Sequence, residues 1–241
     1  MKIDPTEMKQ VAAARPQRFD MYTGVHKALR ALMADTLLAL GRMDPADDLD
    51  LAQTTQRVIQ LLEFCGSHLR HENEFVHTAI EARAPGASSA IAHDHGHHEE
   101  HIVRLCVAAS SLRSMPPELR AAAALDLYRE LALFIADNFH HMNVEETAHN
   151  AVLWARYTDA ELMEIHGALL ASIPPDEMMF VARWLVPFMN PAERTAVVGD
   201  MRAHAPAAAF EAMIDVVRPH LTDREWVKLA DSLGLPPAAA W

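Results

Sequence analysis

Apolar residues recur along the first two-thirds of the chain at alternating steps of three and four, the spacing of a helix that buries one face. Stretches that favour turns interrupt the pattern at "MDPADD", "APGASS" and "SMPPEL". In the first of these, Asp44 followed by Pro45 is typical of a helix start. The pattern predicts long helices near 20–42, 47–83, 89–114 and 117–156. Four long helices with short connections favour an up-down-up-down bundle.

After residue 157 the helical pattern continues in shorter pieces. Thr158 with Glu161, and Thr222 with Glu225, have the spacing of a capping box at a helix start. The expected short helices lie near 159–172, 176–188, 192–203, 207–219 and 223–233. The predicted fold class is therefore all-α, with a four-helix bundle at 15–157 and an accessory C-terminal extension of short helices at 158–241.

Charge and composition indicate which partners and which cellular location to expect. The formal net charge of −12 repels phosphate backbones, so we expect no nucleic-acid partner. No apolar stretch is long enough to span a bilayer and the N-terminus lacks the apolar segment of a secretion signal, so we expect no membrane partner. Two cysteines make no disulfide framework, which favours a cytoplasmic location. The apolar segment 178–189 predicts a docked helix, with homodimerisation as the alternative.

Three of the predicted bundle helices carry polar residues in the middle of an otherwise apolar seam. On the second helix the seam passes through His68 and Glu72, and on the fourth through His141 and Glu145. Residues four apart lie on one face of a helix, so the members of each pair point the same way. The first helix has His26 at an inward position. These helices therefore direct imidazoles and carboxylates into the bundle.

The third helix contains the nonapeptide "HDHGHHEEH" at 93–101. Its apolar seam, followed backwards from the C-terminal end through Leu112, Ala108 and Leu105, leads to His101 and His97. Four helices then each contribute at least one inward imidazole, although a histidine-rich nonapeptide by itself is often an exposed loop.

Two alternatives of register stay open. His98 replaces His97 if a π-bulge or a bent start shifts the third helix. His140 lies beside His141 but is rotated about 100° away from the seam. The remaining histidines of this region are expected on the surface or beside the ligands: His71, His77, His93, His95, His149 and His166.

The inward polar residues need a partner that the apolar core cannot give. A buried ionised carboxylate costs several kcal/mol unless it is paired or bound to a metal. A lone inward histidine is more often a hydrogen-bonded core residue, but four independent helices agree here. The pattern indicates a pair of metal ions held by nitrogen and oxygen donors. The predicted ligands are His26, His68, Glu72, His97, His101, His141 and Glu145.

The ordered set of motifs, with His26 followed by "HLRHE", "HHEEH" and "HMNVE", resembles the hemerythrin-like family over roughly 15–157. The resemblance implies a non-haem di-iron centre with an oxo or hydroxo bridge, in which one iron has an open position for O₂. It also implies residue roles: His97, His101 and His141 on one iron, His26 and His68 on the other, and Glu72 and Glu145 as bridges. Zinc and manganese accept the same kinds of donor.

One departure bears on function. The oxygen carriers of this family end their last motif with His, four residues and Asp, whereas this chain has His141, three residues and Glu145. The resemblance therefore does not by itself imply reversible O₂ carriage. The first hypothesis is a protein that binds or senses O₂, NO or iron status. The alternatives are a di-iron oxidase or peroxidase acting on O₂ or peroxide, and a structural metal that fastens an interaction protein.

Overall fold

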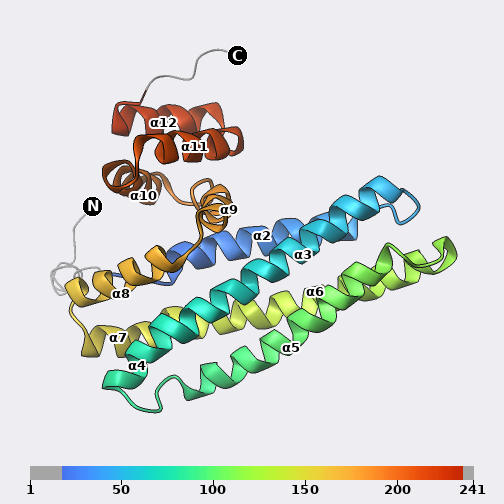
Figure 1. Ribbon diagram of the computed structural model, residues 1–241, viewed down its shortest axis with the longest axis horizontal. Helices are drawn as coiled ribbons and strands as arrows, with labels where there is room; N and C mark the ends of the chain where they lie inside the picture. Colours follow the sequence, from blue (N-terminus) through green and yellow to red (C-terminus); the bar gives the residue numbers. More distant parts are fainter. Residues whose placement is uncertain (1–17, 236–241) are drawn as a thin grey trace, which may run out of the picture.

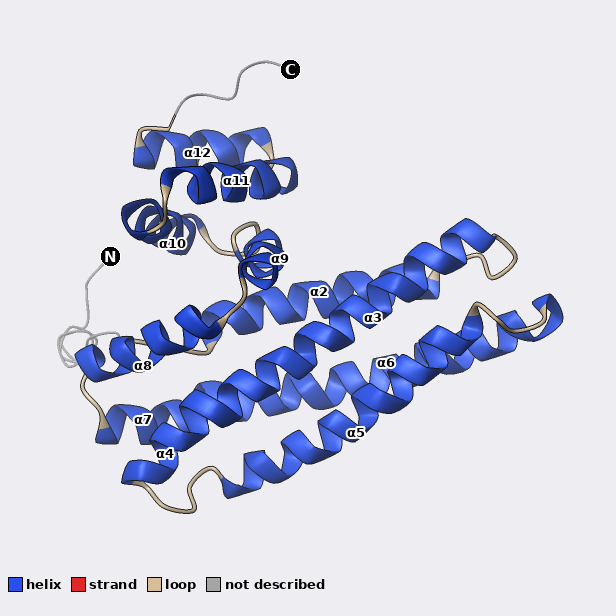
Figure 2. Ribbon diagram, viewed as in Figure 1, coloured by secondary structure: helices blue, strands red, loops and turns tan. Residues whose placement is uncertain are grey.

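The computed structural model describes residues 18–235, and all the regular elements in that range are helices. Four long helical segments run alternately in opposite directions and form the predicted bundle, with short loops at both ends (Figures 1 and 2). They are α2 (Thr23–Gly41), α3 (Asp48–His71) continued by η1 (Glu72–His77) and α4 (Thr78–Arg83), α5 (Ser89–Leu112), and α6 (Pro117–Val144) continued by η2 (Glu145–His149) and α7 (Asn150–Arg156). The all-α bundle is confirmed.

The start of α3 differs from the sequence prediction. Asp47, and not Asp44, caps the helix, and its carboxylate accepts hydrogen bonds from the backbone N–H groups of Leu49 and Asp50. The carboxylate of Asp44 instead accepts from the backbone N–H of Ala46 in the preceding turn. A run with three aspartates offers several caps, and the helix begins at the one that can reach two orphan N–H groups.

The bundle core follows the predicted seams for most of their length. Leu29, Val58, Leu61, Leu131 and Phe134 are at most 1% exposed and belong to one apolar cluster. A second apolar cluster closes the other end of the bundle, around Tyr22, Val76, Ile80, Leu153 and Leu162. Polar donors from four helices lie between these two clusters.

Two segments of π-helix interrupt the bundle helices. Segment η1 begins at Glu72 and segment η2 begins at Glu145. A π turn accommodates one more residue than an α turn, so the residues beyond it are rotated relative to an unbroken helix. Val76 and Leu153 are therefore buried, whereas Phe75 and Val152, each one residue earlier, are only partly buried.

The C-terminal helices correspond closely to those expected from the sequence. They are α8 (Asp159–Ser172), α9 (Pro175–Leu185), α10 (Pro191–His204), α11 (Ala207–Val217), η3 (Arg218–His220) and α12 (Asp223–Leu233). The capping boxes that begin at Thr158 and Thr222 are both present. In Figure 1, α8 lies along the bundle and α10 to α12 stack beyond α9.

Helix α9 joins the two parts of the molecule. Phe180, Val181 and Trp184 pack against the bundle core, whereas Ala182 and Val186 belong to the core of the C-terminal helices. The predicted docking of the apolar segment is thus observed within one chain. Homodimerisation and the boundary between residues 157 and 158 stay predictions. In the described range, no helix combines the length and hydropathy that a bilayer span requires.

Candidate metal centre

Donors from all four bundle segments meet between the two apolar clusters of the bundle. Helix α2 gives one histidine, α3 with η1 gives a histidine and a glutamate, α5 gives one histidine, and α6 with η2 gives the last histidine and glutamate. Nearly all these side chains are fully buried, and the most exposed, His68, is 11% exposed. The residues are His26, His68, Glu72, His95, His141 and Glu145.

The two glutamates divide the cluster into two halves. In the first half, Glu72 Oε1 lies 3.5 Å from His26 Nε2 and 3.1 Å from His68 Nε2. Glu145 Oε2 completes this half at 3.6 Å from His26 Nε2. Each carboxylate has its other oxygen in the second half, so both glutamates face both halves.

The second half is built around two imidazole nitrogens that face each other. His95 Nε2 and His141 Nε2 are 3.0 Å apart. Glu145 Oε1 lies 3.6 Å from the first and 3.2 Å from the second, and Glu72 Oε2 lies 3.7 Å from His95 Nε2. Each half therefore contains two imidazole nitrogens and two carboxylate oxygens.

These polar atoms fit a metal better than they fit one another. All four oxygens of Glu72 and Glu145, and the Nε2 atoms of His26 and His68, are buried without a hydrogen-bond partner in the described part of the chain. Their mutual contacts are close but lack hydrogen-bond alignment. Unsatisfied buried groups of this kind cost about 1–3 kcal/mol each, and more when charged. Imidazole nitrogens and carboxylate oxygens suit iron, zinc and manganese, so cations would satisfy the whole set.

Outer contacts fix which nitrogen of His26 and which nitrogen of His95 faces the centre. His26 Nδ1 lies 3.0 Å from Glu146 Oε1, and Arg30 holds the same carboxylate at 2.6 Å. His95 Nδ1 lies 2.8 Å from the amide oxygen of Asn73. Both acceptors require an N–H at Nδ1, which leaves the Nε2 lone pair directed at the centre. Histidines that bind metals in proteins are commonly oriented in this way.

In the metal-free protein, protons take the place of cations. Burial lowers the pKa of His26, but Glu146 and Glu72 outweigh it and bring that pKa to about 9. Burial likewise lowers the pKa of His141, and Glu145 raises it above its ordinary value. Burial raises the pKa of Glu72, but His68 and His26 outweigh it and hold that pKa well below its ordinary value. The glutamates are thus ionised and paired with imidazolium groups that a metal would displace.

The sequence that forms this bundle matches the model of a known family. The model described as "Hemerythrin HHE cation binding domain" matches residues 18–149, more than half of the chain. The chain belongs to the hemerythrin HHE cation-binding family. A search of curated proteins finds no match. The buried histidines and glutamates fit the cation binding that the family description states. All six donors lie within the matched residues, and we call them the HHE cluster: His26, His68, Glu72, His95, His141 and Glu145.

Five of the predicted ligands lie in the HHE cluster and two do not. The five are His26, His68, Glu72, His141 and Glu145. His97 is exposed, and its Nε2 lies 3.1 Å from His93 Nε2. His101 is partly buried, and its Nε2 lies 3.5 Å from Glu130 Oε2. Neither belongs to a donor group in the described residues.

The difference arises from the register of α5. The sequence-based seam passed through Ala108 and His101, but Ala108 is exposed and Ala109 is fully buried. The buried face runs through Ile91, His95, His98, Leu105, Ala109 and Leu112. His95 and His98 were expected on other faces, and they are 1% and 7% exposed. Alternating steps of three and four from Leu112 would have reached His98 and then His95.

Two further histidines lie beside the HHE cluster. His77, at the end of η1, and His149, at the end of η2, form a third donor group with Glu145. The ring of His77 stacks on that of His95 with centroids 4.8 Å apart. Tyr22, itself 1% exposed, has its hydroxyl 3.2 Å from His149 Nδ1. The two π turns bring His77 and His149 inward. An apolar seam drawn with the constant period of an α-helix does not predict their inward position.

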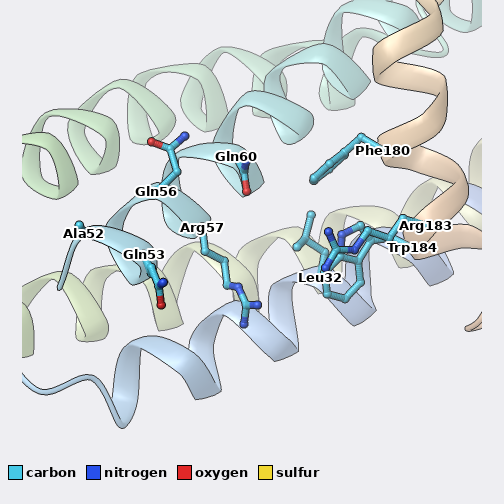
Figure 3. A pocket seen from close by; sticks show the side chains of 9 residues that line it. All are labelled: Leu32, Ala52, Gln53, Gln56, Arg57, Gln60, Phe180, Arg183 and Trp184. Carbon is cyan, nitrogen blue, oxygen red and sulfur yellow. The ribbon is translucent and has the colours of Figure 1, made fainter. Parts of the chain in front are cut away.

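A pocket of about 470 Å³ lies away from the HHE cluster, between α2, α3 and α9 (Figure 3). Arg57 forms an ion pair with Asp35 at 2.8 Å, and the polar groups on the pocket wall are guanidinium and amide groups. These groups do not suit a cation. The lining residues are Leu32, Ala52, Gln53, Gln56, Arg57, Gln60, Phe180, Arg183 and Trp184.

The metal-free protein is expected to lose stability as pH rises from 6.5 towards 9. The pKa of His26 is about 9 in the folded protein against 6.5 for a free imidazole, so its contribution is complete below pH 6.5 and is lost as pH rises through the folded pKa. The loss is on the order of 3 kcal/mol. Urea unfolding of chelator-treated protein at several pH values would measure it. Metal-loaded protein serves as the control and should not show this loss, because the cation replaces the proton.

Glu146→Gln is expected to weaken metal binding without removing a proposed ligand. The amide cannot hold both the imidazole of His26 and the guanidinium of Arg30 as the carboxylate does. Loss of such an outer contact typically costs 10–100-fold in metal affinity. Competition with a chelator would measure the change. Asp35→Asn is a matched control, since it breaks an arginine pair remote from the cluster, and an equal loss in both variants would contradict the assignment.

Proposed function

We propose that the HHE cluster binds two iron ions and that the protein binds or senses O₂, or NO, at them. One observation carries the proposal: Glu72 and Glu145 each direct one oxygen into either half of the cluster. A single cation would leave half of these oxygens unsatisfied. Two cations, each with two imidazoles and bridged by both carboxylates, would satisfy all of them.

The proposed ligand set follows the two halves. His26 and His68 hold one iron, His95 and His141 hold the other, and the two glutamates bridge them. Four protein donors on each ion leave room for exogenous ligands. When bound, ferrous ions supply electrons to a small oxidant such as O₂. Zinc and manganese suit the same donors, and the metal identity is part of the test.

The surroundings of the cluster favour a small ligand. The donors lie within the core of the bundle, and apolar side chains close both ends. Such a position leaves no room for a large substrate, while Arg30 and Glu146 keep His26 oriented. A cytoplasmic location is part of the proposal, and the free thiols Cys65 and Cys106 agree with it.

A spectroscopic experiment tests this function. Protein purified without an affinity tag is analysed for metals, reduced anaerobically and then exposed to O₂ or NO. We expect two irons per chain and oxygen-to-iron charge-transfer absorption that disappears when the gas is removed. Bound zinc without a redox response would contradict the proposal and favour a structural metal.

The second candidate function is a di-iron peroxidase or oxidase. The buried hydroxyl of Tyr22, at 3.2 Å from His149 Nδ1, favours it because reduction of peroxide to water consumes protons. His149 shares a donor group with Glu145, so this pair can deliver a proton to the edge of the cluster. Turnover of peroxide that falls in Tyr22→Phe, with metal content unchanged, would support this function over binding alone.

A further inference from the structure

A second cluster of histidines and carboxylates lies outside the HHE cluster, in a polar pocket of about 370 Å³ between α5 and α6. Residues Asp94, His97 and His140 are exposed at this pocket, whereas His98 and His141 are buried. His141 lines the pocket and also belongs to the HHE cluster. The lining residues are Asp94, His97, His98, Glu100, His101, Arg104, Asp137, His140 and His141.

Unsatisfied nitrogens line the inner part of this pocket. His98 Nδ1, His101 Nε2 and His141 Nδ1 are all buried without a hydrogen-bond partner in the described residues. His98 is only 7% exposed, so its nitrogen gains little from water. Its ring centroid lies 4.8 Å from that of His141. A cation that accepts imidazole lone pairs would satisfy His98 Nδ1 or His101 Nε2.

The charge of the pocket favours a cation over an anion. Three carboxylates, those of Asp94, Glu100 and Asp137, line it together with one guanidinium, that of Arg104. Imidazole nitrogens and carboxylates bind divalent transition-metal ions.

We propose that the α5/α6 pocket captures a divalent transition-metal ion from solvent and passes it to the HHE cluster on the side where His141 lines both sites. The delivery step rests on the proposed function, whereas capture in the pocket does not. The six proposed ligands are buried, so an ion must enter through a wall of the bundle. In the pocket, His97, Asp137 and His140 meet the ion at the surface, and His98 receives it beside His141.

The rate of metal loading tests delivery. Metal-free protein is mixed with two equivalents of Co²⁺, and the visible absorption of the bound ion is followed with time. Asp137→Asn/His140→Ala removes two exposed groups at the pocket mouth. We expect loading at least tenfold slower than in the natural protein, with the same final uptake of two ions per chain. Loading at the natural rate would overturn the proposal.

A matched control exists on α10. Asp200 and His204 form an exposed aspartate–histidine pair at 3.2 Å, remote in sequence from the bundle. Asp200→Asn/His204→Ala therefore removes the same two groups and the same charge as the pocket variant. Its loading rate should equal that of the natural protein. Equal slowing in both variants would show a general charge effect and overturn the proposal.

Capture is tested separately from the HHE cluster. In Glu72→Gln/Glu145→Gln the cluster loses both carboxylates, and calorimetric titration with Zn²⁺ should still find one weakly bound ion per chain. Adding His98→Gln should remove that ion. If no ion binds while the pocket is intact, the pocket is not a capture site. If the natural protein takes up no ions in its cluster, the proposed function fails, while this titration still decides on the pocket.

Discussion

Glu72→Gln is expected to leave the protein unable to hold two metal ions. The side chain keeps its size, but a carboxylate that is 3% exposed and faces both halves of the HHE cluster becomes a neutral amide. An amide has one oxygen, so at least one half loses a donor. Metal content should fall from two ions per chain to one or none, with affinity reduced by more than about 100-fold, because loss of an outer contact alone costs 10–100-fold.

The same substitution should remove most of the stabilisation by metal. A ligand present at 1,000 times its dissociation constant stabilises the folded state by about 4 kcal/mol. Elemental analysis after gel filtration and thermal unfolding with and without Fe²⁺ would measure both effects. Glu164→Gln makes the same chemical change at an exposed position of α8 and should change neither. Two tightly held ions in Glu72→Gln would rule out the bridging role.

The second large effect is a loss of bound metal that we expect on substitution of His95 but not of His97. His95→Ala is expected to lower metal content from two ions per chain towards one, because His95 Nε2 faces Glu72, Glu145 and His141 at 3.0–3.7 Å. His97→Ala removes an exposed imidazole of the same helix and should leave the equilibrium metal content unchanged. The two variants are matched in chemistry and differ only in the face of α5 that they alter.

Metal analysis of Fe²⁺-loaded protein after gel filtration, which removes weakly bound ions, would decide between these residues. Circular dichroism should show that both variants keep their helices, since each replaces a histidine by a good helix former. Normal metal content in His95→Ala together with loss in His97→Ala would support the register that the apolar seam predicted. The same result would contradict the register of α5 in the structure.

The donors on three of the four bundle segments could be predicted from the sequence because long apolar seams fix their register. Helix α2 buries Leu29, Met33 and Leu40 around His26, and α6 buries Leu127 and Leu131 before His141. Such seams leave one face that can be inward. Helix α5 has fewer large apolar residues, and alanines at 108 and 109 allow two faces. The choice of His97 followed from that ambiguity.

A helical pattern of constant period could not predict the residues that follow the π turns. The π turns that begin at Glu72 and Glu145 change the period within the helix, so His77 and His149 turn inward. Both turns start at a glutamate that follows a histidine by four residues, and this repeated feature was a usable signal. The contacts of Glu146 and Asn73 join separate helices and required coordinates.

The two π turns also limit how this centre can be transferred to another protein. A designed bundle of ideal α-helices could present the six inward donors, because none of them lies beyond the start of a π turn. It would not present His77 and His149, because each depends on one additional residue in its helix. Grafting the complete shell therefore requires copying both irregular turns with their backbone. A scaffold optimised for regular helices would reproduce the six inner donors and lose His77 and His149 behind them.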